Sequence, residues 1–260
     1  MGTSQLLDPL PIAAVFLLIV LVSLAAYEIG FRSGRWWQDR TPDEKDGPTA
    51  MLVGSILALM AFLLAVTTGM ASDRFDARRA LVLEETNSIG TTYLRAGYLP
   101  EPASTQIRTA LREYVPLRIN VADRDQLEAN FERSAQLLDQ LWLVAEELAR
   151  GAPESDALAI FIESLNQTID LHETRVAAIV YARVPETVLL LLILGAVGAI
   201  GMVGFNAGLS RRRSMVGALA LILILSAVIT LIVDLDRPRE GFLQVSQQPL
   251  VDLAQQIGPP

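Results

Sequence analysis

Four long stretches of the chain contain no Asp, Glu, Lys or Arg: 9–27, 49–72, 187–210 and 214–233. At about 1.5 Å per residue, a helix of each length crosses a hydrocarbon core of about 30 Å. Backbone groups in lipid have no water to bond, so such segments cross a membrane as helices rather than strands. Hydrophobic residues make up 52% of the 260 residues. The sequence therefore predicts an all-α membrane protein with four transmembrane helices.

The spans divide the chain into a membrane part and a helical part between the second and third spans. The first span is not expected to be a cleavable signal peptide, because no Lys or Arg precedes it. The predicted parts are transmembrane helices at about 9–31 and 49–72, an extramembrane helical bundle over 73–186, transmembrane helices at about 187–210 and 214–233, and a C-terminal tail over 234–260.

The segment between the second and third spans has helical periodicity, interrupted at prolines. One helix is predicted to continue out of the second span from Asp73 to Leu99 and to end before Pro100. Three more helices are expected at about 103–119, 123–150 and 154–183, each with apolar residues on one face. Two of the four abut membrane spans, so the bundle is expected to stand on the membrane.

Basic residues are concentrated in the two short loops. These loops hold seven Lys and Arg residues, against none before the first span and two in the tail. The positive-inside rule places the short loops in the cytoplasm and the 73–186 segment outside the cell (inner) membrane. Trp36 and Trp37, beside the first span, are expected to anchor it at the lipid–water interface.

Composition excludes several classes of function. The chain has no cysteine and a formal net charge of −8, which excludes thiolate chemistry and a broad basic surface for nucleic acid. The sequence contains no phosphate loop, no metal-ligand spacing and no Ser-His-Asp set, so neither a cofactor nor catalysis is expected. His172, the only histidine, and the pair Glu84 and Glu85 are expected to be solvated or partly packed rather than functional.

The second span carries the most regular pattern. A row of small residues recurs every three or four positions and is expected to pack against another helix: Gly54, Ala58, Ala61, Ala65 and Gly69. A neighbouring bulkier row, with Leu59, Phe62 and Val66, could line a pore in a ring of subunits or face lipid. The third span repeats the packing theme with five glycines between 195 and 208. Because the spans hold almost no ionisable residues, a coupled transporter is not expected.

The junction after the second span resembles a known family. The residues from Ala71 to Leu81, ASDRFDARRAL, continue as EETNSIGTTYLR over 84–95, and the tail has DLDRP followed by Gly241 and Pro249-Leu250. These segments resemble the bestrophin-like family of bacterial membrane proteins, which is distantly similar to bestrophin anion channels. The resemblance implies a homo-oligomer, a pentamer with four spans per subunit, embedded in the lipid bilayer and passing small anions.

The resemblance also implies roles for particular residues. Leu59, Phe62 and Val66 would form an apolar pore neck, and Arg74, Arg78 and Arg79 would surround the pore mouth and raise the local concentration of anions. Bestrophins bind calcium with an acidic cluster after the last span, where this chain has Asp234, Asp236 and Glu240 among arginines. A helix end anchored at the interface is the preferred interpretation there. Bestrophins keep the long segment in the cytoplasm, opposite to the charge count.

Three hypotheses follow from these observations. The first is an oligomeric channel, passing small anions passively, with the second span lining the pore. The second is a membrane-anchored sensor or scaffold whose bundle binds a ligand or a partner protein. The third, a membrane enzyme, has the least support, because no span or loop gathers a nucleophile, a base and an orienting group.

Overall fold

The computed structural model describes residues 8–42, 47–119, 124–238 and 241–259. All regular secondary structure within these ranges is helical. The eight helices found there are α1 Ile12–Arg40, α2 Gly47–Ala96, α3 Ala103–Leu117, α4 Arg124–Gly151, α5 Asp156–Val180, α6 Glu186–Leu209, α7 Met215–Asp236 and α8 Gln248–Ile257.

Four of these helices, α1, α2, α6 and α7, are long and apolar enough to cross a membrane, which confirms the four predicted spans. The predicted end of the first helix is wrong. Helix α1 continues to Arg40 instead of ending near residue 31, so the loop begins later than expected. Polar contacts one helical turn apart favour this extension. Glu28 accepts a 2.9 Å bond from Arg32, and the Arg40 guanidinium lies 3.6 Å from the centre of the Trp36 ring.

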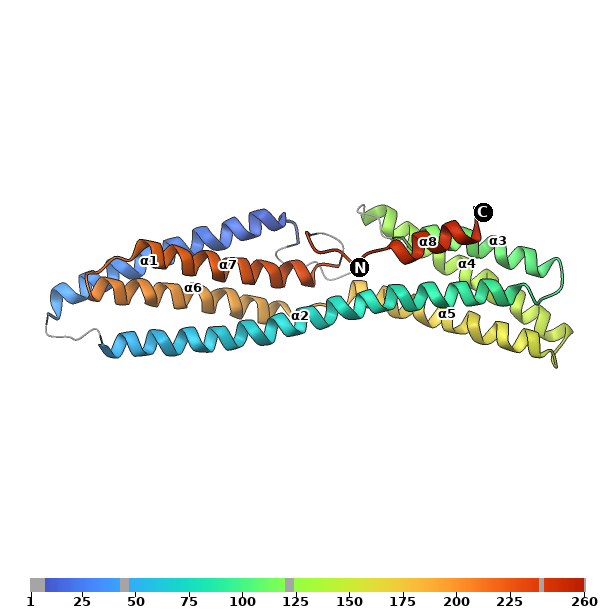
Figure 1. Cartoon of the computed structure of the whole chain (residues 1–260), viewed down its shortest axis with the longest axis horizontal. Coiled ribbons are helices and arrows are strands. Elements are labelled where there is room, and N and C mark those ends of the chain that lie inside the picture. Colours follow the sequence, from blue (N-terminus) through green and yellow to red (C-terminus); the bar gives the residue numbers. More distant parts are fainter. Residues whose placement is uncertain (1–7, 43–46, 120–123, 239–240, 260) are drawn as a thin grey trace.

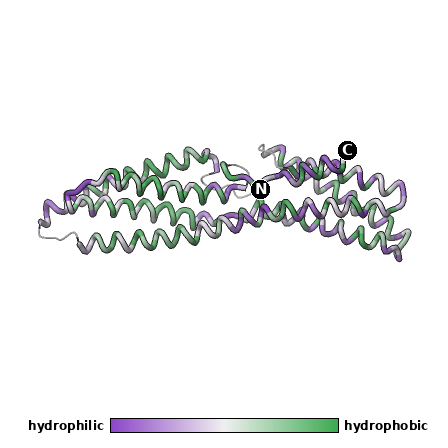
Figure 2. Tube along the Cα trace, in the orientation of Figure 1, coloured by the Kyte–Doolittle hydropathy of each residue, from purple (hydrophilic) through white to green (hydrophobic). Residues whose placement is uncertain are grey.

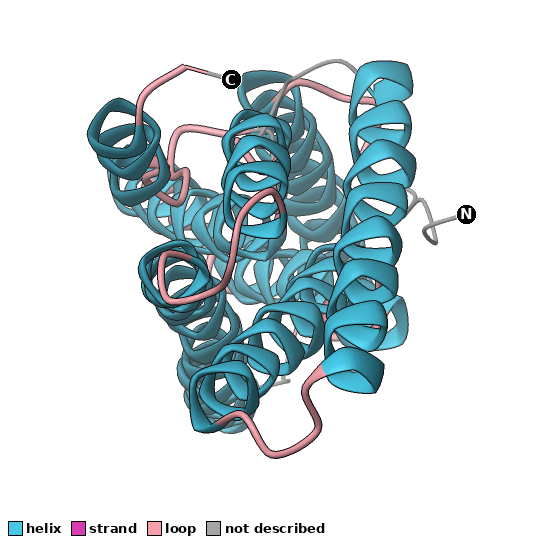
Figure 3. Ribbon diagram, turned by 90° about the vertical axis from the view of Figure 1, so that its right-hand side faces the viewer, coloured by secondary structure: helices cyan, strands magenta, loops and turns pink. Residues whose placement is uncertain are grey.

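The helices form an elongated molecule with two ends of different character (Figure 1). One end holds α1, α6, α7 and the first half of α2, and it is mostly apolar along its length (Figure 2). The other end holds α3, α4, α5, α8 and the second half of α2, where apolar and polar residues alternate. An end-on view shows the helices running roughly side by side along the long axis (Figure 3).

Helix α2 joins the two ends without a break. Its 50 residues correspond to about 75 Å of helix, far more than a membrane needs. The prediction that a helix continues out of the second span is confirmed. It ends at Ala96, three residues earlier than predicted, because Gly97 begins a turn closed by bonds from the N–H groups of Gly97 and Tyr98 to the carbonyls of Leu94 and Arg95.

The core of the bundle end is formed by the apolar faces that the sequence predicted for α4 and α5. Leu137, Leu141, Phe161 and Leu165 are all buried there with Tyr114 of α3. The observed bounds of α3, α4 and α5 agree with the predicted ones to within three residues. Buried apolar area of this kind stabilises a fold by about 25 cal/mol per Å².

The helix α8 in the C-terminal tail is absent from the sequence prediction. Leu250, Leu253 and Ile257 lie three or four residues apart, so they share one face of α8. All three are buried in the bundle core, against α2 and α3. The segment is only ten residues long, and a helix this short depends on tertiary packing for stability. The tail is therefore folded onto the bundle.

Helices α1 and α6 approach backbone to backbone at glycines. A Cβ atom added at Gly30 would lie 2.0 Å from the carbonyl oxygen of Gly201, and one added at Gly204 would lie 2.2 Å from that of Tyr27. Gly208 is equally crowded. The prediction that the glycines of the third span serve helix packing is confirmed at these positions. Such contacts replace the hydrophobic effect, which does not drive helices together in lipid.

We expect Gly204→Ala to lower the thermal unfolding temperature of the protein in detergent, because the added methyl group forces α1 and α6 apart. Overpacking of this kind costs about 1–3 kcal/mol. The matched control is Gly198→Ala on the same helix, where a Cβ meets nothing within 4 Å. Alanine favours helix more than glycine does, so the control should lose no stability. Equal losses in the two variants would contradict backbone contact at Gly204.

Candidate functional site

The apolar half of α2 carries three rows of side chains with different surroundings. One row is buried against the rest of the chain: Val53, Met60, Leu64, Thr67 and Ala71. At about 100° per residue, the row of Leu59, Phe62 and Val66 lies roughly 140° from the buried row, and the small-residue row lies roughly 130° from it on the other side. The neck candidates have exposed fractions of 58%, 64% and 47%.

The small-residue row does not pack within the chain. Gly54, Ala58, Ala61, Ala65 and Gly69 are all exposed. A Cβ added at Gly54 or Gly69 would meet nothing within 4 Å. A packing role for this row is therefore still a prediction.

The three arginines predicted at the pore mouth have different environments. Arg79 is exposed. Arg74 is half-buried and donates a 2.5 Å hydrogen bond from Nη1 to the carbonyl oxygen of Arg183. Arg78 is only 5% exposed, and its Nη2 donates to the carbonyl oxygen of Leu235 at 2.5 Å. The Arg78 side chain thus points into the chain, because its position on α2 continues the buried row. This differs from the solvent-facing position that a place at the pore mouth requires.

The acidic residues after the last span are buried acceptors. Asp234 accepts hydrogen bonds from the backbone N–H groups of Phe242 and Leu243 at 2.9 and 3.0 Å. A side chain at Gly241, where φ is +137°, would clash with Asp234. Glu240 lies outside the described residues. Within the described residues, no group of three potential ligands gathers as a metal site would require. The interfacial anchoring preferred from the sequence stays a prediction.

Arg183 connects the start of the chain to the end of α7. Its Nη1 and Nη2 donate to the two carboxylate oxygens of Asp8 at 2.6 and 2.9 Å, and its Nε donates to Asp236 at 3.2 Å. The second oxygen of Asp236 accepts the backbone N–H of Val184 at 2.7 Å. Asp236, a weak metal candidate, therefore has both oxygens occupied by N–H donors.

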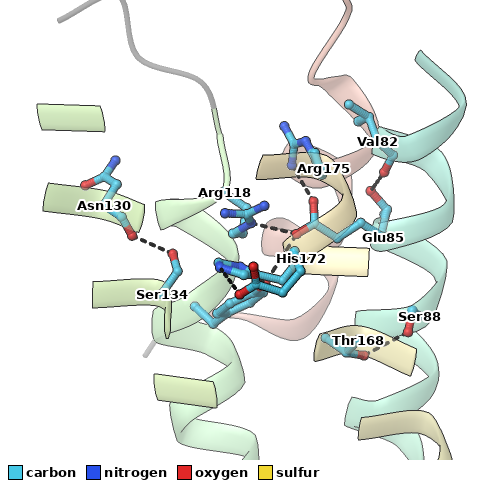
Figure 4. A network of polar contacts seen from close by, with 12 residues as sticks. Val82, Glu85, Ser88, Arg118, Asn130, Ser134, Thr168, His172 and Arg175 are labelled. Carbon is cyan, nitrogen blue, oxygen red and sulfur yellow. Dashed lines mark hydrogen bonds and ion pairs between the residues drawn. The ribbon is translucent and has the colours of Figure 1, made fainter. Parts of the chain in front are cut away.

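A carboxylate is buried in the middle of the bundle end (Figure 4). Glu85 has no exposed surface. One oxygen accepts a 2.6 Å bond from Nε of Arg118, the residue directly after α3, and the other accepts a bond from Arg175 Nη1 of α5. Arg175 also donates from Nη2 to Gln247 at 2.7 Å. The expectation that Glu85 lies on a solvated face is wrong, whereas Glu84 is exposed as expected.

The same cluster contains the only histidine. Tyr114 OH lies 3.2 Å from the carboxylate of Glu85 and 3.0 Å from Nδ1 of His172. His172 is only 3% exposed, so it is more deeply packed than the solvated or partly packed side chain expected. Four residues before His172 on α5, the hydroxyl of Thr168 lies 2.8 Å from the hydroxyl of Ser88 on α2. This chain of polar contacts ties α2, α3 and α5 together.

Burial and charge fix the protonation states in the cluster. Burial alone would raise the pKa of Glu85, but the guanidinium groups of Arg118 and Arg175 outweigh it and lower that pKa below its ordinary value. Burial raises the pKa of Tyr114. Burial, together with the charge of Arg118, lowers the pKa of His172 to about 4. At neutral pH the cluster thus holds a carboxylate, a phenol and a neutral imidazole, none of which is poised to exchange a proton.

The partners of Glu85 were not singled out from the sequence. Arg175 lies on α5 and Arg118 directly follows the end of α3, both beside apolar residues. A charged residue at a core-facing position is the one signal that could have found them. Tyr114 could have been found in a similar way, because it is a residue with a polar hydroxyl between Leu111 and Val115 on a buried face.

We expect Glu85→Gln to lower the stability of the protein strongly, because it leaves two buried guanidinium groups without a counter-charge. Breaking a buried pair by removing one partner costs about 3–5 kcal/mol. Thermal unfolding in detergent measures the loss. Glu84→Gln, one residue away and exposed, is the matched control, with a change within about 0.5 kcal/mol. A Glu85 variant as stable as its control would show that the cluster does not stabilise the fold.

We also expect stability to fall as the pH is lowered from about 6.5 to about 4, because the unfolded state then binds a proton at His172 that the folded state does not. The full effect is about 3 kcal/mol. His172→Gln should remove this part of the pH dependence, since the chain has no other histidine. Unfolding temperatures of both proteins across this range provide the test, and parallel curves would refute the assignment.

Comparisons with known proteins agree with this architecture. The sequence profile of the bestrophin-like domain matches residues 17–250. A tyrosine-to-alanine variant of the bacterial bestrophin homologue from Klebsiella pneumoniae is 15% identical, with a TM-score of 0.69 over 95% of this chain and 97% of that one. Another structure of the Klebsiella pneumoniae homologue is 17% identical, with a TM-score of 0.65 over 95% of each chain. No curated protein matched. The fold is that of bacterial bestrophin homologues, and the chain belongs to the bestrophin-like family.

Proposed function

We propose that copies of this chain assemble in a ring around a passive ion pathway lined by α2, with α3, α4, α5 and α8 outside the membrane. The observation that carries the proposal is the poor burial of α2. Only 17% of its most apolar window is buried within the chain, against 33–39% in the other three spans. Its three rows would then face its own subunit, a neighbouring subunit and the central axis.

The small-residue row is the surface that we assign to the neighbouring subunit. Small side chains let helix backbones approach closely in lipid, where association depends on packing. At about 100° per residue, the same side of α2 continues beyond the membrane with Leu83 and Leu94. These two are 52% and 65% exposed, and such apolar side chains mark interaction surfaces when they gather on one face. A pentamer, as in the family resemblance, is the arrangement that we propose.

Leu59, Phe62 and Val66 would form the neck of the pathway. All three are exposed apolar side chains on one side of α2. A ring of such side chains can gate a pore by expelling water. The stretch 49–72 holds no ionisable residue, and coupled transport normally needs charges within the membrane. Passive conduction therefore suits α2 better than coupled transport does.

The charge at the mouth favours small cations over the anions expected from the sequence. Arg78 is buried, and Arg79 lies roughly 130° around α2 from the neck row. Two exposed acids, Asp73 and Glu84, continue the neck row beyond the apolar stretch instead. Repeated around a ring, carboxylates attract cations and repel anions. We therefore propose a preference for cations, and the anion preference implied by the family resemblance is the alternative that the flux measurement decides.

We expect Phe62→Ala to raise ion flux through proteoliposomes about tenfold, because a smaller side chain lowers the barrier to wetting the neck. Such a change corresponds to roughly 1.4 kcal/mol in the barrier. Parallel measurements of potassium and chloride flux in the same liposomes should give more potassium than chloride.

The matched control is Leu194→Ala, an apolar residue of α6 with 60% exposure. Its flux should equal that of the unmodified protein. Equal effects of the two substitutions, or no flux above that of empty liposomes, would overturn the assignment of α2 to a pore. A chloride flux larger than the potassium flux would agree with a pore but contradict the cation-attracting role proposed for Asp73 and Glu84.

A further inference from the structure

A small pocket lies where the end of the apolar half meets the bundle. It is partly open to solvent and is lined by α2, α5 and the segment that leads from α7 to α8. Two arginines line it, Arg78 from α2 and Arg175 from α5, and the segment contributes Pro238, Val245 and Gln247. Most of the remaining wall is apolar, so charges inside the pocket interact more strongly than they do in water.

Arg78 brings unused hydrogen-bond donors to this pocket. It is 5% exposed, and only Nη2 is bonded, to the carbonyl oxygen of Leu235. Nε and Nη1 are buried and have no hydrogen-bond partner among the described residues. A buried donor left unpaired costs about 1–3 kcal/mol, and more when it is charged. Buried charges are normally paired, so the arrangement lacks an acceptor.

The charges around the pocket do not supply that acceptor. The groups that act on Arg78 are the carboxylate of Asp236 and the guanidinium groups of Arg183 and Arg74. Among the described residues Asp236 accepts from Arg183 and from the N–H of Val184, and neither Nε nor Nη1 of Arg78 reaches it.

On the far side of the pocket, Arg175 must share one carboxylate with Arg118. Two guanidinium groups therefore stand against the single charge of Glu85. Both sides of the pocket carry an excess of positive charge, which an anion between them would balance.

We propose that this pocket binds a small monovalent anion of the chloride type. The space holds about one water-sized particle, which suits a single halide and leaves no room for a phosphate or a lipid headgroup. The ion accepts hydrogen bonds from Nε and Nη1 of Arg78. It links α2 and α5 to the segment before α8, so it fastens the tail to the bundle. The site lies within one chain and does not depend on conduction.

The experiment compares thermal unfolding of the purified full-length protein in sodium chloride and in sodium gluconate at equal ionic strength. Gluconate is too large for the pocket. With chloride about ten times its dissociation constant, the unfolding temperature should be about 3–5 °C higher than in gluconate. Bromide should replace chloride and allow the ion to be located by anomalous scattering next to Arg78.

Two variants remove the site in different ways. Arg78→Gln removes the donors, and Ala178→Leu fills the pocket while Arg78 is kept. Both should lose the difference between chloride and gluconate, and circular dichroism and gel filtration report whether each one folds. Arg150→Gln, an exposed arginine at the end of α4, should keep the full difference. No chloride effect in the unmodified protein, stabilisation by phosphate alone, or an effect that persists in the folded Ala178 variant would overturn the proposal.

Discussion

One uninterrupted helix sets the geometry of the whole chain. Apart from Thr86 and Ser88, the buried residues of α2 recur at spacings of three, four and seven from Val53 through Ala71 and Arg78 to Ala96. At about 100° per residue these positions stay on one side of the helix over its full length. Helices α3, α5, α6, α7 and α8 therefore pack against the same side of one rod, whereas α1 packs on α6 and α7 and α4 packs on α3 and α5. The opposite side of α2 is left free at both ends of the molecule. Neither the membrane half nor the bundle half can move along α2 without the other.

Two charged residues, Arg78 and Glu85, interrupt this mostly apolar row, and their partners determine which elements pack there. Arg78 bonds to the end of α7, and Glu85 bonds to Arg118 at the end of α3 and to Arg175 of α5. A buried ion pair adds little net stability, but a misplaced one costs several kcal/mol. The partner residues therefore fit the buried row of α2 in one register only. Apolar contacts alone would tolerate a shift by a helical turn far more easily.

The sequence predicted what depends on local pattern and missed what depends on distant partners. Charge-free runs and helical periodicity were enough for the four spans, the continuation of α2 and the three bundle helices. The short helix α8 could not be found in the same way, because its stability comes from burying Leu250, Leu253 and Ile257 in a core made elsewhere in the chain. Glu85 next to Glu84 looked like part of a solvated face, since nothing local reveals that two arginines from 33 and 90 residues away meet its carboxylate.

The same constraints limit how a pathway along α2 could open. Rotating α2 about its axis would bring Phe62 away from the centre, but it would also carry Glu85 away from both guanidinium groups, at a cost of about 3–5 kcal/mol per subunit. In a ring that cost would be multiplied by the number of subunits. Rotation of the Phe62 side chain or tilting of whole subunits leaves the cluster intact. An opening of the neck that keeps the bundle rigid is therefore favoured over one that turns the helix.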